Sequence, residues 1–283
     1  MKNIDPEQLV KEVNRRYAKI AVGRESSCCA PAPSAESATA TSCCGTTEAE
    51  VSGGLGYETD DLQSLPEGAN MGLGCGAPVD HLDLKPGEVV LDLGSGGGID
   101  VFLAAKQVGP DGKVIGVDMT PEMIERARQN ADSAGFDQVE FRLGRLEDLP
   151  VDDNSVDAVT SNCVINLVPD KQRVFNEIAR VLKPGGRLVI SDVVLDEPLP
   201  ESVAGDLLAY VGCVAGAMQR DAYFAAVEAA GLTDVEIFGD VDFLAAAEDH
   251  IPDDLTDLME STGIGLGDVR GKVHSVTFRA TKR

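Results

Sequence analysis

The chain has 283 residues, 43% of them hydrophobic, which is enough to bury one large domain or one domain with appendages. Its 48 acidic and 24 basic residues leave a net charge of -24, which excludes nucleic-acid binding, because that needs basic residues to displace phosphate counterions. No apolar run reaches the roughly eighteen residues of a membrane span, and the first residues lack the apolar core of a signal peptide, so we expect a soluble cytoplasmic protein.

The excess of acidic residues has two interpretations. One is a solvated acidic surface. The other is a protein of a salt-rich, halophilic cytoplasm, in which high ionic strength screens the repulsion between carboxylates. The second interpretation predicts a melting temperature that rises with added salt.

The N-terminal region, residues 1–50, is predicted to be separate from the main domain. Apolar residues recur at three- and four-residue steps from Asp5 to about Ala21, which predicts an amphipathic helix. Residues 26–50 consist mainly of Ser, Ala, Thr and Pro, so burial cannot offset the entropy of ordering and a flexible segment is expected. Residues 55–76 mix short helical signals with glycine turns and are predicted to form a lid.

Strand and helix patterns alternate along the main domain, which we assign to residues 51–240. The predicted elements, in chain order, are a strand at 89–93, a helix at 101–108, a strand at 112–118, a helix from Thr120 to Gly135, strands at 139–144 and 156–162, a helix at 171–182 closed by Lys-Pro-Gly-Gly, a strand at 187–194, a helix at 221–231 and strands at 235–238 and 272–283. This order predicts a Rossmann-like α/β fold with a mostly parallel seven-stranded sheet and helices on both faces. Residues 241–283 are expected to form a small C-terminal extension.

The first strand ends in a glycine cluster with Gly94, Gly96 and Gly98, where a ligand can approach backbone N–H groups closely. Asp118 stands twenty positions beyond Gly98, at the end of the second strand, where a carboxylate can accept hydrogen bonds from both hydroxyls of a ribose. Ile99 occupies the position where a dinucleotide-binding loop has glycine or alanine. The pattern therefore favours an adenosyl cofactor without a pyrophosphate, and the alternative is a plain turn.

Three of the seven cysteines lie within the main domain: Cys75 between two glycines, Cys163 after the fourth strand and Cys213 in an apolar stretch. Loops at the carboxyl ends of parallel strands converge on one crevice, so we expect the three thiols to meet there under the lid. The glycines beside Cys75 would let its thiol approach a large ion. In the alternative interpretation each cysteine is a small buried hydrophobe, which the surroundings of Cys213 favour.

Several motifs together identify a family resemblance. The stretches VLDLGSGGG, IGVDMTPEM and VLKPGGRLVISD resemble those of class I S-adenosylmethionine-dependent methyltransferases over about residues 70–240. Within that class, GANMGLGCGAPV, SNCVINLVPDK, YVGCVAGA and the paired N-terminal cysteines resemble the arsenite methyltransferases. The resemblance implies that S-adenosylmethionine is bound, with Asp118 on the ribose, Met119 on the adenine and Glu147 near the adenine amine. The implied cofactor residues are Asp92, Gly94, Ser95, Gly96, Gly98, Asp118, Met119, Leu146, Glu147 and Asn162.

The same resemblance implies that the chain methylates trivalent arsenic in arsenic detoxification. Cys75, Cys163 and Cys213 would hold arsenite as thiolates, which suit a soft ion. The arsenic lone pair would attack the methyl group, and a thiol reductant, thioredoxin or glutathione, would restore the trivalent state. Two rival functions remain open: a methyltransferase for a small organic acceptor such as a quinone precursor, and a metalloid-binding protein without turnover.

The N-terminal cysteines Cys28, Cys29, Cys43 and Cys44 come in two adjacent pairs. A zinc site would lack the favourable C-x-x-C spacing, and a disulfide between neighbours is strained. Capture of arsenite, a redox relay and an inert tail are the remaining interpretations. The histidines are scattered, and each is expected to be a structural or surface residue: His81, His250 and His274.

Overall fold

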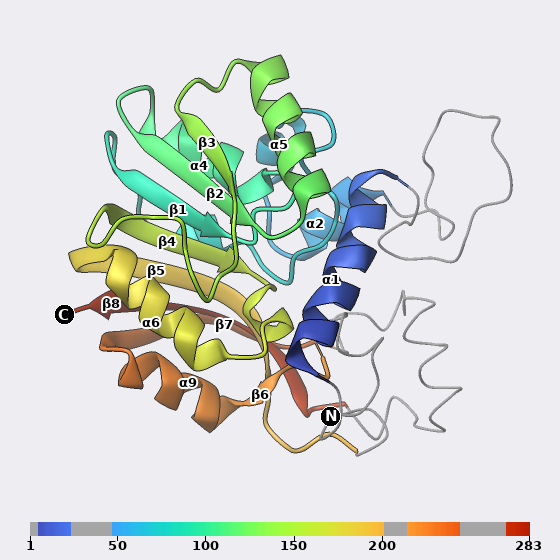
Figure 1. Ribbon diagram of the computed structural model, residues 1–283, viewed down its shortest axis with the longest axis vertical. Coiled ribbons are helices and arrows are strands. Elements are labelled where there is room, and N and C mark those ends of the chain that lie inside the picture. Colours follow the sequence, from blue (N-terminus) through green and yellow to red (C-terminus); the bar gives the residue numbers. More distant parts are fainter. Residues whose placement is uncertain (1–4, 24–46, 201–213, 244–269) are drawn as a thin grey trace, which may run out of the picture.

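The computed structural model describes residues 5–23, 47–200, 214–243 and 270–283 (Figure 1). One sheet lies at its centre, with the strand order β3-β2-β1-β4-β5-β8-β7 and with β6 paired to β5. The strands are β1 Val89–Leu93, β2 Lys113–Asp118, β3 Val139–Leu143, β4 Val156–Asn162, β5 Leu182–Leu195, β6 Met218–Gln219, β7 Leu232–Asp242 and β8 Val273–Lys282. Within this sheet only β8 pairs antiparallel, with β5 and β7. The predicted fold is confirmed, with the short β6 added to the seven expected strands.

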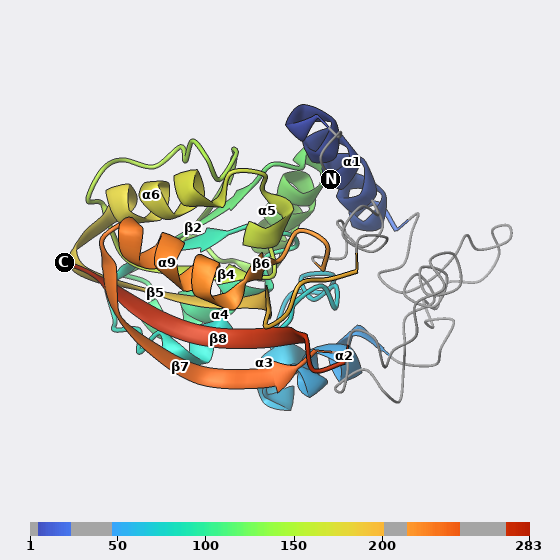
Figure 2. The same ribbon diagram turned by 90° about the horizontal axis from the view of Figure 1, so that it is seen from below.

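Two apolar layers cover the sheet, because successive side chains of a strand point to opposite faces. Val90 and Val114 face the layer that contains α4 (Ile99–Val108) and α5 (Pro121–Ala134). Leu91 and Ile115 face the layer of α6 (Lys171–Val181) and α9 (Arg220–Ala229). Helices α6 and α9 lie side by side in Figure 2. Between them, the rings of Phe175 and Tyr223 meet edge to face with their centroids 5.3 Å apart.

Three details differ from the sequence prediction. Strand β5 starts at Leu182 and runs through the Lys-Pro-Gly-Gly stretch, because Leu182 already pairs with Val156 and a bulge takes up the change of register. Thr120 lies at the start of α5, as predicted, but its side chain makes no capping hydrogen bond. Strand β8 lies between β5 and β7, so the C-terminal residues supply an internal strand, and the boundary expected at residue 240 falls within β7.

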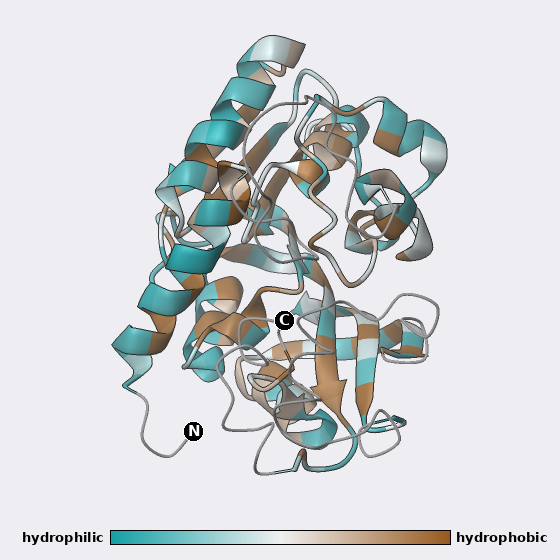
Figure 3. Ribbon diagram, turned by 90° about the vertical axis from the view of Figure 1, so that its right-hand side faces the viewer, coloured by the Kyte–Doolittle hydropathy of each residue, from teal (hydrophilic) through white to brown (hydrophobic). Residues whose placement is uncertain are grey.

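The N-terminal helix α1 (Pro6–Ala21) is confirmed, and it packs against α5. Figure 3 shows its hydrophobic residues on the side toward the rest of the protein, and the buried ones include Leu9 and Val13. A second helix, α2 (Glu48–Gly54), starts from a capping box formed by Thr47 and Glu50, so the stretch predicted to be flexible does not extend to residue 50. The rest of that stretch lies outside the described residues.

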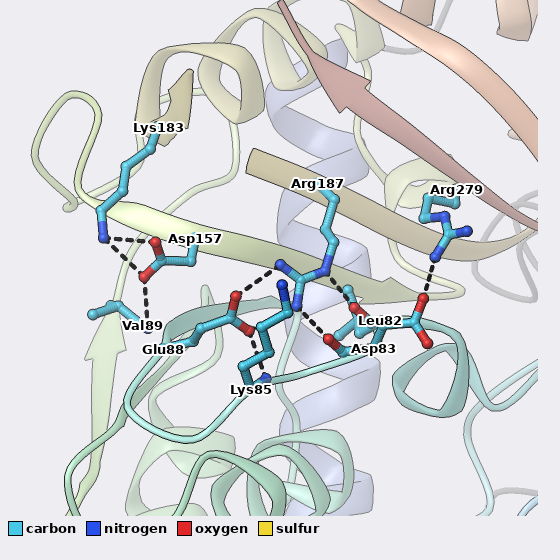
Figure 4. Close-up of polar contacts among 9 residues, drawn as sticks. All are labelled: Leu82, Asp83, Lys85, Glu88, Val89, Asp157, Lys183, Arg187 and Arg279. Carbon is cyan, nitrogen blue, oxygen red and sulfur yellow. Dashed lines mark hydrogen bonds and ion pairs between the residues drawn. The ribbon is translucent and has the colours of Figure 1, made fainter. Parts of the chain in front are cut away.

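The lid region leads through α3 (Thr59–Gln63) and the 3-10 helix η1 (Pro78–His81) into β1. A polar cluster holds the segment between the lid and β1 at the amino-end edge of the parallel strands: Leu82, Asp83, Lys85, Glu88, Val89, Asp157, Lys183, Arg187 and Arg279 (Figure 4). Arg187 at the centre donates to the carbonyl oxygens of Leu82 and Asp83 and pairs with Glu88 at 2.7 Å. These contacts hold the entry into β1 in place, so the lid residues before it start from a fixed end.

Candidate active site

A cavity lies at the carboxyl ends of β1, β2 and β4, the edge at which Rossmann-like sheets bind their ligands. Its walls enclose about 1080 Å³, open solvent at the mouth included, which is the scale of a small-molecule site. Nine of the ten predicted cofactor residues line it: Asp92, Gly94, Ser95, Gly96, Asp118, Met119, Leu146, Glu147 and Asn162. Gly98, the N-terminal cap of α4, does not, although its neighbours Gly97 and Ile99 do.

The glycine loop and Asp118 are joined by hydrogen bonds. Asp118 accepts from the N–H of Gly96 at 3.1 Å and from the N–H of Thr120 at 2.8 Å. Burial raises the pKa of Asp118, and these N–H donors oppose the rise. Gly96 has φ of +49° and open space where a side chain would stand, so the loop presents bare backbone to the cavity beside a carboxylate. This arrangement can receive a ribose.

The cavity is acidic. Four carboxylates line it, those of Asp92, Asp100, Asp118 and Glu147, whereas Arg145 is the single basic residue among the described lining. Arg145 is itself paired with Glu147 at 3.0 Å. Burial and the neighbouring carboxylates of Asp100 and Asp118 raise the pKa of Asp92 well above its usual range, so the site disfavours further negative charge. A cavity lined by these carboxylates fits a positively charged adenosyl ligand and disfavours a pyrophosphate.

Helix α1 forms part of the cavity wall, which sequence reasoning did not anticipate. Val10, Val13 and Tyr17 line the cavity, and the amide of Asn14 donates to the carbonyl oxygen of Met119 at 3.0 Å. The amphipathic pattern predicted a buried face for this helix but contained no signal for what that face would cover.

Cys75 is buried, and contacts to three strands hold it. Its N–H donates to Oδ1 of Asn162 at 2.9 Å, its carbonyl oxygen accepts from Ser275 at 2.6 Å, and its thiol donates to the carbonyl oxygen of Ser191 at 3.4 Å. A Cβ at Gly74 would come within 2.8 Å of Asn162, and one at Gly76 within 2.5 Å of Ser191. The flanking glycines therefore allow the lid to lie directly on β4 and β5, which is a different reason from the ion approach that we expected.

Cys163 directly follows β4 and lines the cavity. It is buried, and its φ of +55° is a left-handed conformation that residues other than glycine rarely adopt. Its N–H donates at 2.8 Å to the carbonyl oxygen of Ser191, the same atom that accepts from the thiol of Cys75. The two cysteines also belong to one buried apolar cluster. The structure thus brings together Cys75 and Cys163.

The remaining predicted residues divide into two groups. Cys213 and His250 lie outside the described residues, as do all four N-terminal cysteines: Cys28, Cys29, Cys43 and Cys44. His81 stacks on Phe238, and His274 lies 2.8 Å from a carboxylate oxygen of Asp240. Neither of these two histidines lines the cavity.

Within the ranges that the structure describes, no group of three or more His, Cys, Asp or Glu side chains is arranged to hold a metal ion. No helix in those same ranges has the length and apolar character needed to cross a membrane.

The strand order, the glycine loop joined to Asp118 and the acidic cavity define a class I methyltransferase. A family model described as a methyltransferase domain matches residues 84–238. The arsenite methyltransferase of Halobacterium salinarum is 52% identical over 82% of this chain and 59% of its own length. That of Aquipseudomonas alcaligenes is 39% identical over 78% of this chain and 61% of its own length.

Among solved structures, an arsenic(III) S-adenosylmethionine methyltransferase from Chlamydomonas reinhardtii matches with a TM-score of 0.61 and 33% identity, over 83% of this chain and 74% of that chain. The chain belongs to the arsenite methyltransferase family. It spans about three fifths of the length of the curated relatives that it matches.

Proposed function

We propose that the protein methylates trivalent arsenic with S-adenosylmethionine as the methyl donor. The observation that carries this proposal is the shared carbonyl oxygen of Ser191, which accepts from the thiol of Cys75 and the N–H of Cys163. Cys163 lines the acidic cavity, and Cys75 is buried behind the lining residue Gly74. Thiolates suit a soft three-coordinate ion. Cys213 is proposed as the third ligand on the family resemblance alone.

The described residues fit the cofactor. Asp118 would accept from the ribose hydroxyls, Met119 and Leu146 would contact the adenine, and Glu147 would accept from its amine. Asp92 lines the same cavity, and a positively charged ligand would favour its ionised form. When bound, S-adenosylmethionine supplies an electrophilic methyl group on a sulfonium sulfur.

The thiolates have two tasks in this proposal. Each thiol gives its proton to a hydroxyl group of As(OH)3, which leaves as water, so affinity for arsenite should depend on pH where the thiols ionise. They also hold arsenic with its lone pair toward the methyl carbon, so no general base is needed, and orientation can contribute about 7–11 kcal/mol to the rate enhancement. Arsenic would give its lone pair to the new As–C bond while the methyl–sulfur bond breaks and S-adenosylhomocysteine leaves, so arsenic is formally oxidised by two electrons. A thiol reductant, thioredoxin or glutathione, would return those electrons by forming a disulfide.

The test is incubation of the protein with arsenite, S-adenosylmethionine and glutathione, followed by speciation of arsenic. Methylated arsenic should form with the intact protein and be lost in Cys75→Ser, Cys163→Ser and Cys213→Ser. Cys28→Ser serves as the matched control and should retain product at saturating arsenite. An intact protein that binds the cofactor but forms no methylated arsenic would instead favour an organic acceptor.

A further inference from the structure

The side chain of Asn162 is hydrogen-bonded to two backbone groups of the Cys75–Gly76 segment. Oδ1 accepts from the N–H of Cys75 at 2.9 Å, and Nδ2 donates at 2.7 Å to the carbonyl oxygen of Gly76, one residue further on. Because Asn162 is also the residue before Cys163, both buried cysteines are attached to it, one through its side chain and one through its own backbone.

Further contacts keep this amide in one orientation. Nδ2 carries two protons, and the second is directed at the hydroxyl oxygen of Tyr57 at 2.8 Å. Tyr57 in turn donates to Asp100 at 2.8 Å, and both residues are buried. An amide turned the other way would face the Gly76 carbonyl with its oxygen, so the network allows one placement.

From this geometry we propose that Asn162 is a positioning residue of the thiol site: it sets the distance and direction of Cys75 relative to Cys163. The proposal rests on the proposed function for what the thiols bind, and the family resemblance instead assigned Asn162 to the cofactor. Ser275 holds Cys75 from the opposite side, through the carbonyl oxygen of Cys75 at 2.6 Å, and does not line the cavity. Its removal therefore tests the placement of Cys75 without altering a residue of the cofactor wall.

Two variants and one control separate these roles. Asn162→Ala removes both backbone contacts to the Cys75–Gly76 segment, and Ser275→Ala removes the carbonyl contact. Asn130→Ala is the control, because the side-chain amide of Asn130 also donates to a backbone carbonyl, but to that of Gly97 at 3.0 Å and not to the Cys75–Gly76 segment. Thermal melting of all three checks that each variant folds.

The first readout is the rate at which iodoacetamide alkylates Cys75, measured by peptide mass spectrometry without arsenic or cofactor. We expect at least a fivefold increase in Asn162→Ala and in Ser275→Ala, and less than a twofold change in Asn130→Ala. Unchanged rates in both folded variants would overturn the proposal whatever the substrate is. This readout does not depend on the proposed function.

The second readout is arsenite affinity measured by calorimetry in the absence of cofactor. Asn162→Ala should bind arsenite at least about tenfold more weakly, equivalent to about 1.4 kcal/mol. If the variant binds arsenite like the intact protein and loses only affinity for S-adenosylhomocysteine, Asn162 is a cofactor residue and the positioning role is wrong. Intact protein that does not bind arsenite, combined with the expected alkylation pattern, would refute the proposed function alone.

Discussion

Gly76→Ala tests how closely the lid must lie on the sheet. The new Cβ would stand 2.5 Å from Oγ and 2.8 Å from Cβ of Ser191, and 3.0 Å from Oγ1 of Thr277. Rotation of the hydroxyl relieves only the first contact, because Cβ of Ser191 is fixed by a buried strand. Ordinary contact begins at 3.4 Å, so the lid has to move away by about half an ångström or more.

We expect a net loss of about 0.5–4 kcal/mol of stability. Overpacking a buried site costs about 1–3 kcal/mol, and disruption of the Ser191–Thr277 hydrogen bond of 2.8 Å adds about 0.5–1.5 kcal/mol. The lower entropy of the unfolded alanine chain returns about 0.4–1 kcal/mol. Because Cys75 adjoins the displaced residue, the rate of arsenic methylation should fall by up to about a hundredfold, the effect of a misplacement of about 1 Å.

The assay is urea unfolding combined with arsenic speciation. Gly239→Ala is the matched control, since its Cβ would lie 3.7 Å from Thr277, an ordinary contact, and its stability should stay within about 1 kcal/mol of that of the intact protein. A Gly76→Ala protein with the stability and methylation rate of the intact protein would refute the reasoning about close approach.

Three other predictions use independent features. Asp118→Ala should weaken S-adenosylmethionine binding at least about a hundredfold by calorimetry, since hydrogen bonds to a charged acceptor contribute about 1.5–3 kcal/mol each; exposed Asp137→Ala is the control, and equal affinities would contradict the role of Asp118. Burial raises the pKa of Asp192 from 3.8 to about 7, so folded protein keeps a proton that the unfolded chain releases and stability falls as pH rises between those values. Asp192→Asn should lessen that decline in urea unfolding, and an unchanged slope would argue against it. With a net charge of -24, the melting temperature should rise between about 0.1 and 2 M KCl, and a constant one would exclude the halophilic interpretation.

Most elements of the fold were predictable because their signals are local. The helix from Pro121 to Gly135 has a proline at its first position and a glycine with φ of +71° at its end, and both features can be read from adjacent residues. The position of β8 was not predictable, because nothing within its own residues says that it separates β5 from β7. Pairing of distant strands decides this, and the same pairing lengthens β7 beyond the four residues expected.

In the candidate site, too, contacts between neighbouring elements were predictable from the sequence and contacts between distant residues were not. The contact between Gly96 and Asp118 follows from a motif around two neighbouring strands, so the sequence reveals it. The contact between Tyr57 and Asn162 joins residues 105 positions apart, and neither has a distinctive neighbour pattern. Asp100 was within reach of prediction, since it stands two positions after the last glycine of the cluster, in the first turn of a helix that begins at the cavity.

The left-handed conformation of Cys163 links the stability of the fold to the proposed chemistry. Such a conformation costs a residue with a side chain of the order of 1–3 kcal/mol, and it persists only where the surroundings hold it. Here the N–H of Cys163 is held by Ser191, and the preceding residue is tied to the lid through its amide. The free energy of folding therefore offsets the cost of this conformation of Cys163 before any ligand binds. A ligand that needs both thiols consequently loses less entropy on binding, which is the general advantage of a preorganised site.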